Sequence, residues 1–572
     1  MREREGEVTR HYIGMAWTVV IVLAGVARAE GERRYALALY HFNVEFVAGS
    51  RSAEDAVVTE SFDPLLDMYL RHPEWGADLE MQGYMIEVLA ERHPAVLAKL
   101  KRLVVAGRVE IVCCHYSDQL VLAFPRTDLE WGFQIDDEIL RAHGLARSPV
   151  AFFQEGQFGE GLLQRLHDCG WRVAVAANGS YDFWQPKDES PLLESREILV
   201  VPGDGRKLSA PDGTRVEVDW TKLGDGEPVA TGSNPYGLKK PFHYDPATLG
   251  AYEANLADRE RRGDRIVAVS RYVDDLRALG VQPTPARPYL DTPWKGKSDD
   301  NVFLWCGRHD QPVEDDVGIH TDVARAREEV LRAEAVADLE DASPAPVVDA
   351  WKHLLRAEVS DSTGWAPLPV EMSYAREHAK AAAKLARTVE GPPARWIDTR
   401  TAKYVDPPEA PEREEASSGP IGVRIEGTIT EKLRWATLGE GVWEVRAGFR
   451  LLPWKLGHAR VVFEGACDEV RYSPAGLDEE VVAVRWADLE PDHAYLALPN
   501  GLVGVGDDLW VVQDHREGMS ACRVSREEVS FEVEGGSRLS HDWRFLVVKG
   551  RARALELALR TNVWPVLPAR GR

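Results

Sequence analysis

Residues 150–171, VAFFQEGQFGEGLLQRLHDCGW, pass from an apolar run into a polar, glycine-spaced turn and then into a helical pattern. The VAFF run is typical of a buried strand, and the leucines that follow repeat at helical spacing until Gly170 ends the helix. Glu155 comes one or two residues after the strand, where the rim of a parallel sheet holds functional groups. Residues 150–171 therefore predict a β-α unit with a carboxylate at its rim.

The same alternation recurs along the first half of the chain. Short apolar runs predict strands at 35–42, 108–114, 150–153, 172–178 and 265–270, and helical patterns cover 81–105, 127–143 and 159–169. Repeated β-α units with apolar strands predict an α/β fold with a parallel sheet, open or closed into a barrel. The segment PDGTRVEVDW, residues 211–220, predicts a hairpin inserted in a loop, with Asp212-Gly213 as its turn.

The second half of the chain has a different pattern. Helical stripes between 317 and 389 predict a bundle, a Pro-, Glu- and Ser-rich stretch predicts a linker, and short β-type runs behind it predict a β-sandwich. We expect a signal peptide at 1–29, an α/β catalytic domain at 33–315, a helical bundle at 316–402, a linker at 403–420 and a sandwich at 421–572.

The charge and composition of the chain limit the classes of partner that it is expected to bind. The chain has 69 basic and 93 acidic residues, a net charge of −24, which argues against nucleic acid or an anionic membrane as the main partner. Residues 13–27 form an apolar stretch before Ala27-Arg28-Ala29, which suits a cleavage site and predicts export to the periplasm or outside, with no membrane attachment after cleavage. The six cysteines form no metal-binding pattern, and they leave one or two disulfides open.

Polar groups follow three of the predicted strands. His41 and Asn43 end the first, Tyr116 and Asp118 follow the second, and Gln154 and Glu155 follow the third. Because carboxyl ends of parallel strands share one edge, these groups should meet at one site. Glu160 instead opens the helix, where an acid suits the helix dipole.

Residues 289–307, YLDTPWKGKSDDNVFLWCG, combine acids and tryptophans in an irregular stretch. Asp291, Trp294, Asp300 and Trp305 are the candidates there, since such residues suit sugar binding and acid catalysis. Asp225, in LGDGEP, is a further candidate, although Asp-Gly is above all a turn signal. No His pair has zinc-ligand spacing, so no metal site is predicted.

Three ordered motifs, LYHFNVEF, GRVEIVCCHYSDQLVLAFP and FFQEGQFGEGLLQRLHDCGW, resemble those of glycoside hydrolase family 57 and its superfamily with family 38 α-mannosidases and polysaccharide deacetylases. WKHLLRAEVSDSTGW, residues 351–365, resembles the motif after the family's barrel. The resemblance implies an incomplete (β/α)7-type barrel, Glu155 as nucleophile and His41 as a substrate contact. Gln154 replaces the usual proline before the nucleophile, and Asn43 replaces a customary second histidine.

The resemblance implies an exported retaining glycoside hydrolase, with an α-glucan-like oligo- or polysaccharide as substrate and no cofactor. Asp291 is the preferred acid/base, with Asp225 and Asp300 as alternatives. The remaining strand-end and loop candidates would line the sugar subsites. A glucanotransferase is the near variant of this hypothesis. A non-catalytic glycan-binding protein and a metal-dependent carbohydrate deacetylase are the alternatives from other classes.

Overall fold

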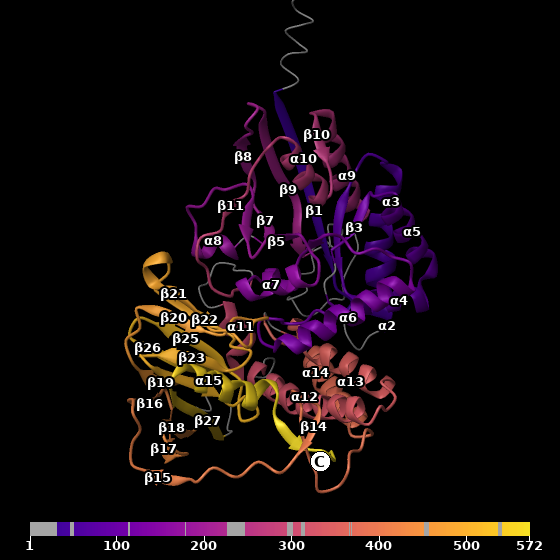
Figure 1. The fold of residues 1–572 in the computed structure, drawn as a ribbon. Coiled ribbons are helices and arrows are strands. Elements are labelled where there is room, and N and C mark those ends of the chain that lie inside the picture. Colours follow the sequence, from indigo (N-terminus) through magenta and orange to yellow (C-terminus); the bar gives the residue numbers. More distant parts are fainter. Residues whose placement is uncertain are drawn as a thin grey trace, which may run out of the picture.

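The computed structural model describes residues 31–45, 51–112, 115–177, 179–225, 246–293, 301–309, 315–364, 367, 369–428, 430–450, 457–535 and 540–571. The predicted signal peptide lies outside the described residues. Figure 1 shows an α/β region, indigo to magenta, above a group of helices and a β-rich region coloured orange to yellow. Within the described ranges, none of the helices has both the length and the apolar character that crossing a membrane requires.

The first sheet is built around β1 (Glu32–Phe42). From Tyr35 onward every residue of β1 is buried, as expected for a strand covered on both faces. β1 pairs in parallel with β9 on one side, and with β2 and β10 on the other. The path β3-β2-β1-β9-β8 consists of β3 (Val109–Ile111), β2 (Ala77–Met81), β1, β9 (Arg215–Asp225) and β8 (Arg206–Ser209), and β10 (Asp264–Ile266) pairs with β1 beside this path.

The predicted inserted hairpin is only partly correct. Its turn is present, with Gly213 at φ 88°, and β8 and β9 pair antiparallel across it. β9, however, continues to Asp225 and pairs in parallel with β1 from Glu32 to His41. The second strand is therefore a central part of the first sheet. Alternation in the sequence indicates a local hairpin, but it carries no information about a distant parallel partner.

The second sheet contains the strand with which the quoted stretch begins. β4 (Val150–Ala151), β5 (Val173–Ala176) and β7 (Ile198–Pro202) are parallel, and β6 (Leu193–Ser195) and β11 (Thr284–Pro285) complete the order β11-β6-β7-β5-β4. A parallel bridge between Ile111 and Arg147 connects the end of β3 with the residues before β4. The longer helices of this region are α3 (Asp63–Arg71), α4 (Gly83–Arg92), α5 (Pro94–Val105), α6 (Arg126–Ala142), α7 (Glu160–Asp168), α9 (Pro246–Arg261) and α10 (Val269–Ala278), and the short ones include α2 (Arg51–Ala56) and α8 (Tyr181–Trp184). The region is thus mixed α/β with parallel strands.

Three helices, α12 (Asp316–Leu339), α13 (Ala345–Ala357) and α14 (Pro369–Ala386), pack on one another below the α/β region (Figure 1). The stretch expected as a linker contains β14 (Lys403–Val405) and β15 (Glu414–Ala416). β14 belongs to a small sheet with β13 (Trp396–Asp398) and β28 (Val566–Pro568).

The C-terminal region is formed by two large, mainly antiparallel sheets. One follows the order β16-β19-β26-β25-β22 and the other β15-β17-β18-β27-β24-β23-β20-β21. Phe545 of β27 (Ser540–Lys549) contacts Phe463 of β19 (Gly457–Glu464) and Phe531 of β26 (Glu528–Gly535), with ring centroids 5.2 and 4.9 Å apart. The two sheets therefore face each other. Their other strands are β16 (Val423–Glu426), β17 (Thr430–Thr437), β18 (Val442–Arg450), β20 (Glu469–Tyr472), β21 (Val482–Arg485), β22 (His493–Leu496), β23 (Leu502–Val505), β24 (Leu509–Gln513) and β25 (Ala521–Ser525).

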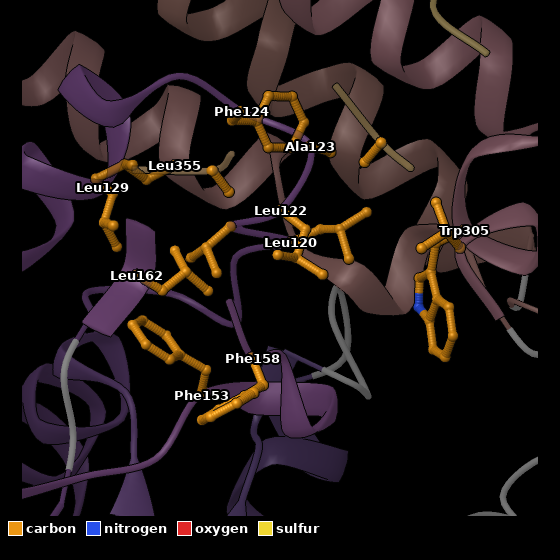
Figure 2. Close-up of a cluster of buried hydrophobic side chains, with 14 of the residues drawn as sticks. Leu120, Leu122, Ala123, Phe124, Leu129, Phe153, Phe158, Leu162, Trp305 and Leu355 are labelled. Carbon is orange, nitrogen blue, oxygen red and sulfur yellow. The ribbon is translucent and has the colours of Figure 1, made fainter. Parts of the chain in front are cut away.

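One continuous hydrophobic core joins all three regions. Figure 2 shows part of it: Phe153 and Phe158 from the α/β region lie near Leu120 and Leu122, and Leu355 of α13 lies near Leu129 of α6. A shared core fixes the position of the bundle relative to the carboxyl ends of the strands. This arrangement determines which residues meet at the candidate site.

Candidate active site

The predicted strand-end motifs meet the segment between α13 and α14. The Gln154 side-chain amide donates a hydrogen bond to Ser360 Oγ at 2.9 Å, and the Ser360 backbone N–H donates to the Asp118 carbonyl at 2.8 Å. Asn43 Nδ2 donates to Asp361 Oδ2 at 2.6 Å. These contacts bring the ends of three strands together with Ser360 and Asp361, which belong to the motif at residues 351–365.

Glu155 has an unusual backbone conformation. It lies in the short η3 turn (Gln154–Gly156) after β4, with φ 57° and ψ 20°, and Gly156 follows at φ 56°. A left-handed conformation costs a residue with a side chain about 1–2 kcal/mol. Such strain is found disproportionately at functional sites. Glu160, in contrast, begins α7 and forms an ion pair with Arg196 at 3.0 Å, as a helix-start acid would.

A buried cluster of one histidine and two acids lies at the ends of β1, β2 and β3. His41 Nδ1 hydrogen-bonds Glu80 Oε2, and one ligand atom each from His41, Glu80 and Asp118 lies within 4.8 Å of the others. Gln82 Nε2 donates to Asp118 Oδ2 at 2.6 Å. Burial raises the pKa of Asp118 well above its usual value. The sequence indicated His41 and Asp118 but missed Glu80, whose only signal was its place, with Asp78, as one of two acids in the buried run ADLEM.

A third buried acid, Glu45, connects this cluster with the helical bundle. Glu45 Oε2 accepts the Asp118 backbone N–H at 3.1 Å, and its Oε1 accepts a hydrogen bond from the Tyr374 hydroxyl at 3.0 Å. Arg356 Nε lies 3.3 Å from the same oxygen. Burial is the largest effect on Glu45 and raises its pKa to about 7. Sequence patterns did not single out Glu45, because its partners come from distant helices.

Tyr116 lies at the edge of this cluster. It is 2% exposed and donates a hydrogen bond to Glu87 of α4 at 3.0 Å. Lys352 of α13 lies over its ring, with Nζ 5.4 Å from the centroid. The tyrosine thus connects the strand end to both helices.

The two described aspartate candidates occupy different places. Asp291 is buried against the C-terminal region: its Oδ2 accepts the Ala475 backbone N–H at 2.7 Å, and its own N–H donates to the Tyr472 hydroxyl at 3.0 Å. Burial raises the pKa of Asp291 to about 7. Asp225 is the last residue of β9, and its backbone is in register with His41. Cα atoms of β9 also lie within 8 Å of Cα atoms of η3, which contains Glu155.

The remaining candidates come from residues 294–305. Trp305, in α11 (Asn301–Cys306), is 2% exposed and packs against Gly364, where an added Cβ would lie 2.3 Å from the indole nitrogen. Figure 2 shows Trp305 among buried side chains. Trp294 and Asp300 lie outside the described residues. The described cysteines, at positions 169, 306, 467 and 522, are free, and Cys113 and Cys114 also lie outside the described residues.

The fold is similar to that of a solved structure. An α-mannosidase from Enterococcus faecalis V583 matches with a TM-score of 0.61 over 94% of this chain and 90% of that chain, at 9% identity. Two further structures are more distant. A protein in Glycosyl Hydrolase Family 38 from Enterococcus faecalis matches with a TM-score of 0.47 over 93% of this chain and 88% of that chain, at 10% identity. A 4-α-glucanotransferase from Thermococcus litoralis matches with a TM-score of 0.42 over 91% of this chain and 100% of that chain, at 12% identity. No protein-family model and no curated protein matches the sequence. The α-mannosidase match confirms, at the level of the fold, the resemblance seen in the motifs.

Proposed function

We propose that this protein is an exported retaining glycoside hydrolase that acts on an oligo- or polysaccharide, with α-linked glucans as the first substrates to test. The observation that carries the proposal is the left-handed Glu155, held where the ends of β1, β3 and β4 meet the bundle. The α-mannosidase-like fold supports it. In this proposal the parallel strands of the first two sheets, bridged at Ile111 and Arg147, form the incomplete (β/α)7-type barrel.

Glu155 would attack the anomeric carbon and form a glycosyl-enzyme, while an aspartic acid protonates the leaving oxygen and then activates water. Retention requires the two carboxyl groups to lie about 5–5.5 Å apart. His41, Asn43 and Gln154 would hydrogen-bond the sugar hydroxyls. Their positions around the strand ends suit that role.

We assign the acid/base role to Asp225 in preference to Asp291. Asp225 ends β9 with its backbone in register with His41, and Cα atoms of β9 lie within 8 Å of η3, the turn that contains Glu155. Asp291 already accepts a backbone hydrogen bond from Ala475 and packs at the contact with the C-terminal region. Its burial there suits a structural role.

The first test uses the full chain on a panel of α- and β-linked aryl glycosides and α-glucans. Wild type should turn over at least one α-linked substrate with retention, seen by NMR of the initial product anomer. Glu155→Gln should lower kcat at least 10³-fold with unchanged folding, and a fluorinated glycoside should label Glu155 in wild type, detected by peptide mass spectrometry. Inversion, or labelling of another residue, contradicts the assignment. Binding without turnover on the whole panel would instead support a glycan-binding protein.

A second test separates the aspartates. Without its acid, a retaining glycosidase still cleaves substrates with good leaving groups, and azide can replace water in the second step. Asp225→Asn should therefore keep turnover of dinitrophenyl glycosides, lose turnover of natural linkages, and gain rate with azide. Asp291→Asn should show none of these signatures. The reverse pattern would restore Asp291 to the role.

One observation favours a deacetylase as the second candidate, namely the buried His41, Glu80 and Asp118 group. Acetate release from acetylated xylan and chitin oligomers, measured with and without added zinc, tests that reaction directly.

A further inference from the structure

His41, Glu80 and Asp118 form a compact group, of which the proposed glycosidase uses only His41, as a contact to the sugar. β1 and β2 pair in parallel with His41 opposite Glu80, and Asp118 follows β3, the next strand in the sheet. The side chains of Glu80 and Asp118 are fully buried and that of His41 nearly so. Their ligand atoms lie within 4.8 Å of one another, so a single ion can contact all three.

Each carboxylate has one engaged and one unengaged oxygen among the described residues. Glu80 Oε2 is paired with His41, whereas Oε1 is buried without a hydrogen bond and lies 3.9 Å from His115 Nε2. Asp118 Oδ2 accepts from Gln82, whereas Oδ1 is buried without a hydrogen bond. Burying an oxygen without a hydrogen-bond partner is unfavourable, and more so when the oxygen is charged. The unengaged oxygens therefore point to a ligand.

The charges of the group indicate the sign of the charge that this ligand carries. Two buried carboxylates repel each other, and His41, the imidazole hydrogen-bonded to Glu80, compensates at most one of their charges, while His115 Nε2 stays 3.9 Å from Glu80 Oε1. A bound cation is frequently the largest local charge in such a site. One imidazole nitrogen and two carboxylate oxygens are ligands of zinc-type sites that keep coordination positions open.

We propose that His41, Glu80 and Asp118 bind one divalent transition-metal ion of the Zn²⁺ class. The ion takes the place of the proton between His41 and Glu80 and engages the buried oxygens. Gln82 holds Asp118 in orientation through its 2.6 Å hydrogen bond, the kind of support that ligating carboxylates receive in metal sites. The site lies beside the proposed glycosidase centre, but its existence does not depend on that function.

The test is metal binding by the purified full chain after chelator treatment. Zn²⁺ titration followed by calorimetry should give one tight site per chain, and Co²⁺ should give visible absorption from a low-coordinate site. Glu80→Gln and Asp118→Asn should each weaken binding at least 100-fold, with folding checked by circular dichroism. Anomalous scattering at the zinc edge in wild-type crystals should place the ion between the three side chains, independently of any variant.

The His353 and His378 pair provides the matched control. Their Nδ1 atoms lie 2.7 Å apart on α13 and α14, so this pair is another place where zinc can bind adventitiously. His353→Gln should leave the tight site intact. Zinc binding that disappears in His353→Gln, or that survives both Glu80→Gln and Asp118→Asn, overturns the proposal, as does the absence of tight binding in wild type.

Failure here is distinguishable from failure of the proposed function. A chelator-treated chain without tight Zn²⁺ binding that still hydrolyses glycosides with retention refutes only the metal site. A chain that binds one Zn²⁺ through Glu80 and Asp118 but cleaves no glycoside refutes only the hydrolase.

Discussion

At the scale of single residues, Glu155 combines a proposed chemical role with a strained backbone. Its φ of 57° is unfavourable for any residue with a Cβ and neutral for glycine. We expect Glu155→Gly to raise the free energy of unfolding by about 1 kcal/mol relative to Glu155→Ala, because both variants lose the carboxylate but only glycine relieves the strain. Urea unfolding measures the difference. An alanine variant as stable as the glycine variant would contradict the left-handed conformation.

The buried Asp291 leads to a second prediction, on how the stability of the fold depends on pH. Burial raises its pKa from 3.8 to about 7 in the folded chain, so between these values the folded state binds more protons than the unfolded state. This contribution makes wild type most stable below pH 4, and stability falls as pH rises to 7. Asp291→Asn removes the titration.

The matched measurement is urea unfolding of wild type and Asp291→Asn at pH 4 and pH 8. The stability of the variant relative to wild type should increase by roughly 2–4 kcal/mol between these two pH values. A relative stability that does not change with pH would show that Asp291 ionises normally in the folded chain.

At the scale of helices and strands, Glu334 connects three helices through two tryptophans. It lies in α12 and accepts hydrogen bonds from the indoles of Trp131 in α6 and Trp351 in α13, at 3.1 and 3.0 Å. The two rings stack with centroids 5.4 Å apart. Glu334→Leu leaves both indole N–H groups without a partner, and we expect a loss of about 2–4 kcal/mol of stability. Glu334→Gln keeps an acceptor and should lose less, as measured by unfolding followed through tryptophan fluorescence. Equal losses would show that the hydrogen bonds contribute little.

The helices and strands also show which elements could be predicted from the sequence. α6 and α7 begin and end within one residue of the predicted helices, because their apolar spacing and the following glycines are local signals. β2 was missed and β9 was misplaced, because both are defined by pairing with β1 rather than by local pattern. The five-residue strand β2 contains two acids, Asp78 and Glu80, and looks polar until its neighbours across the sheet are known.

For the candidate site, too, local features could be predicted from the sequence and long-range contacts could not. His41, Asp118 and Glu155 could be proposed because strand ends share an edge, a property that topology gives to any parallel sheet. Glu45 could not, since its partners Tyr374 and Arg356 belong to helices more than 300 residues later in the chain. Contacts of that range depend on how the bundle docks, which periodicity does not encode.

At the scale of the whole molecule, the bundle and the C-terminal region complete the α/β region. The Leu120 backbone N–H donates to the Glu358 carbonyl, and a bridge pairs Gln119 with Val359, so the segment after α13 closes over the strand ends. On the other side, Asp291 is held by Ala475 from the C-terminal region. With one core shared by all three regions, the site depends on the docking of both later regions.

A substitution at Gly161 tests whether the C-terminal region packs against α7. Gly161 lies in α7, and an added Cβ would lie 2.1 Å from the Ala475 carbonyl oxygen, a backbone atom that cannot rotate away. In an isolated helix alanine is about 1 kcal/mol more favourable than glycine. Here the clash must separate α7 from the C-terminal region, so we expect Gly161→Ala to lower stability by roughly 1–3 kcal/mol.

Gly250 is the matched control for this prediction, because it lies in helix α9 and an added Cβ there meets nothing within 4 Å. Gly250→Ala should raise stability by about 0.5–1 kcal/mol through helix propensity alone. Urea unfolding of the two variants should therefore shift in opposite directions. Because Ala475 also donates to Asp291, Gly161→Ala should weaken the pH dependence attributed to that carboxyl group, whereas Gly250→Ala should leave it unchanged. Two variants with the same gain in stability would show that α7 does not pack against Ala475 in solution.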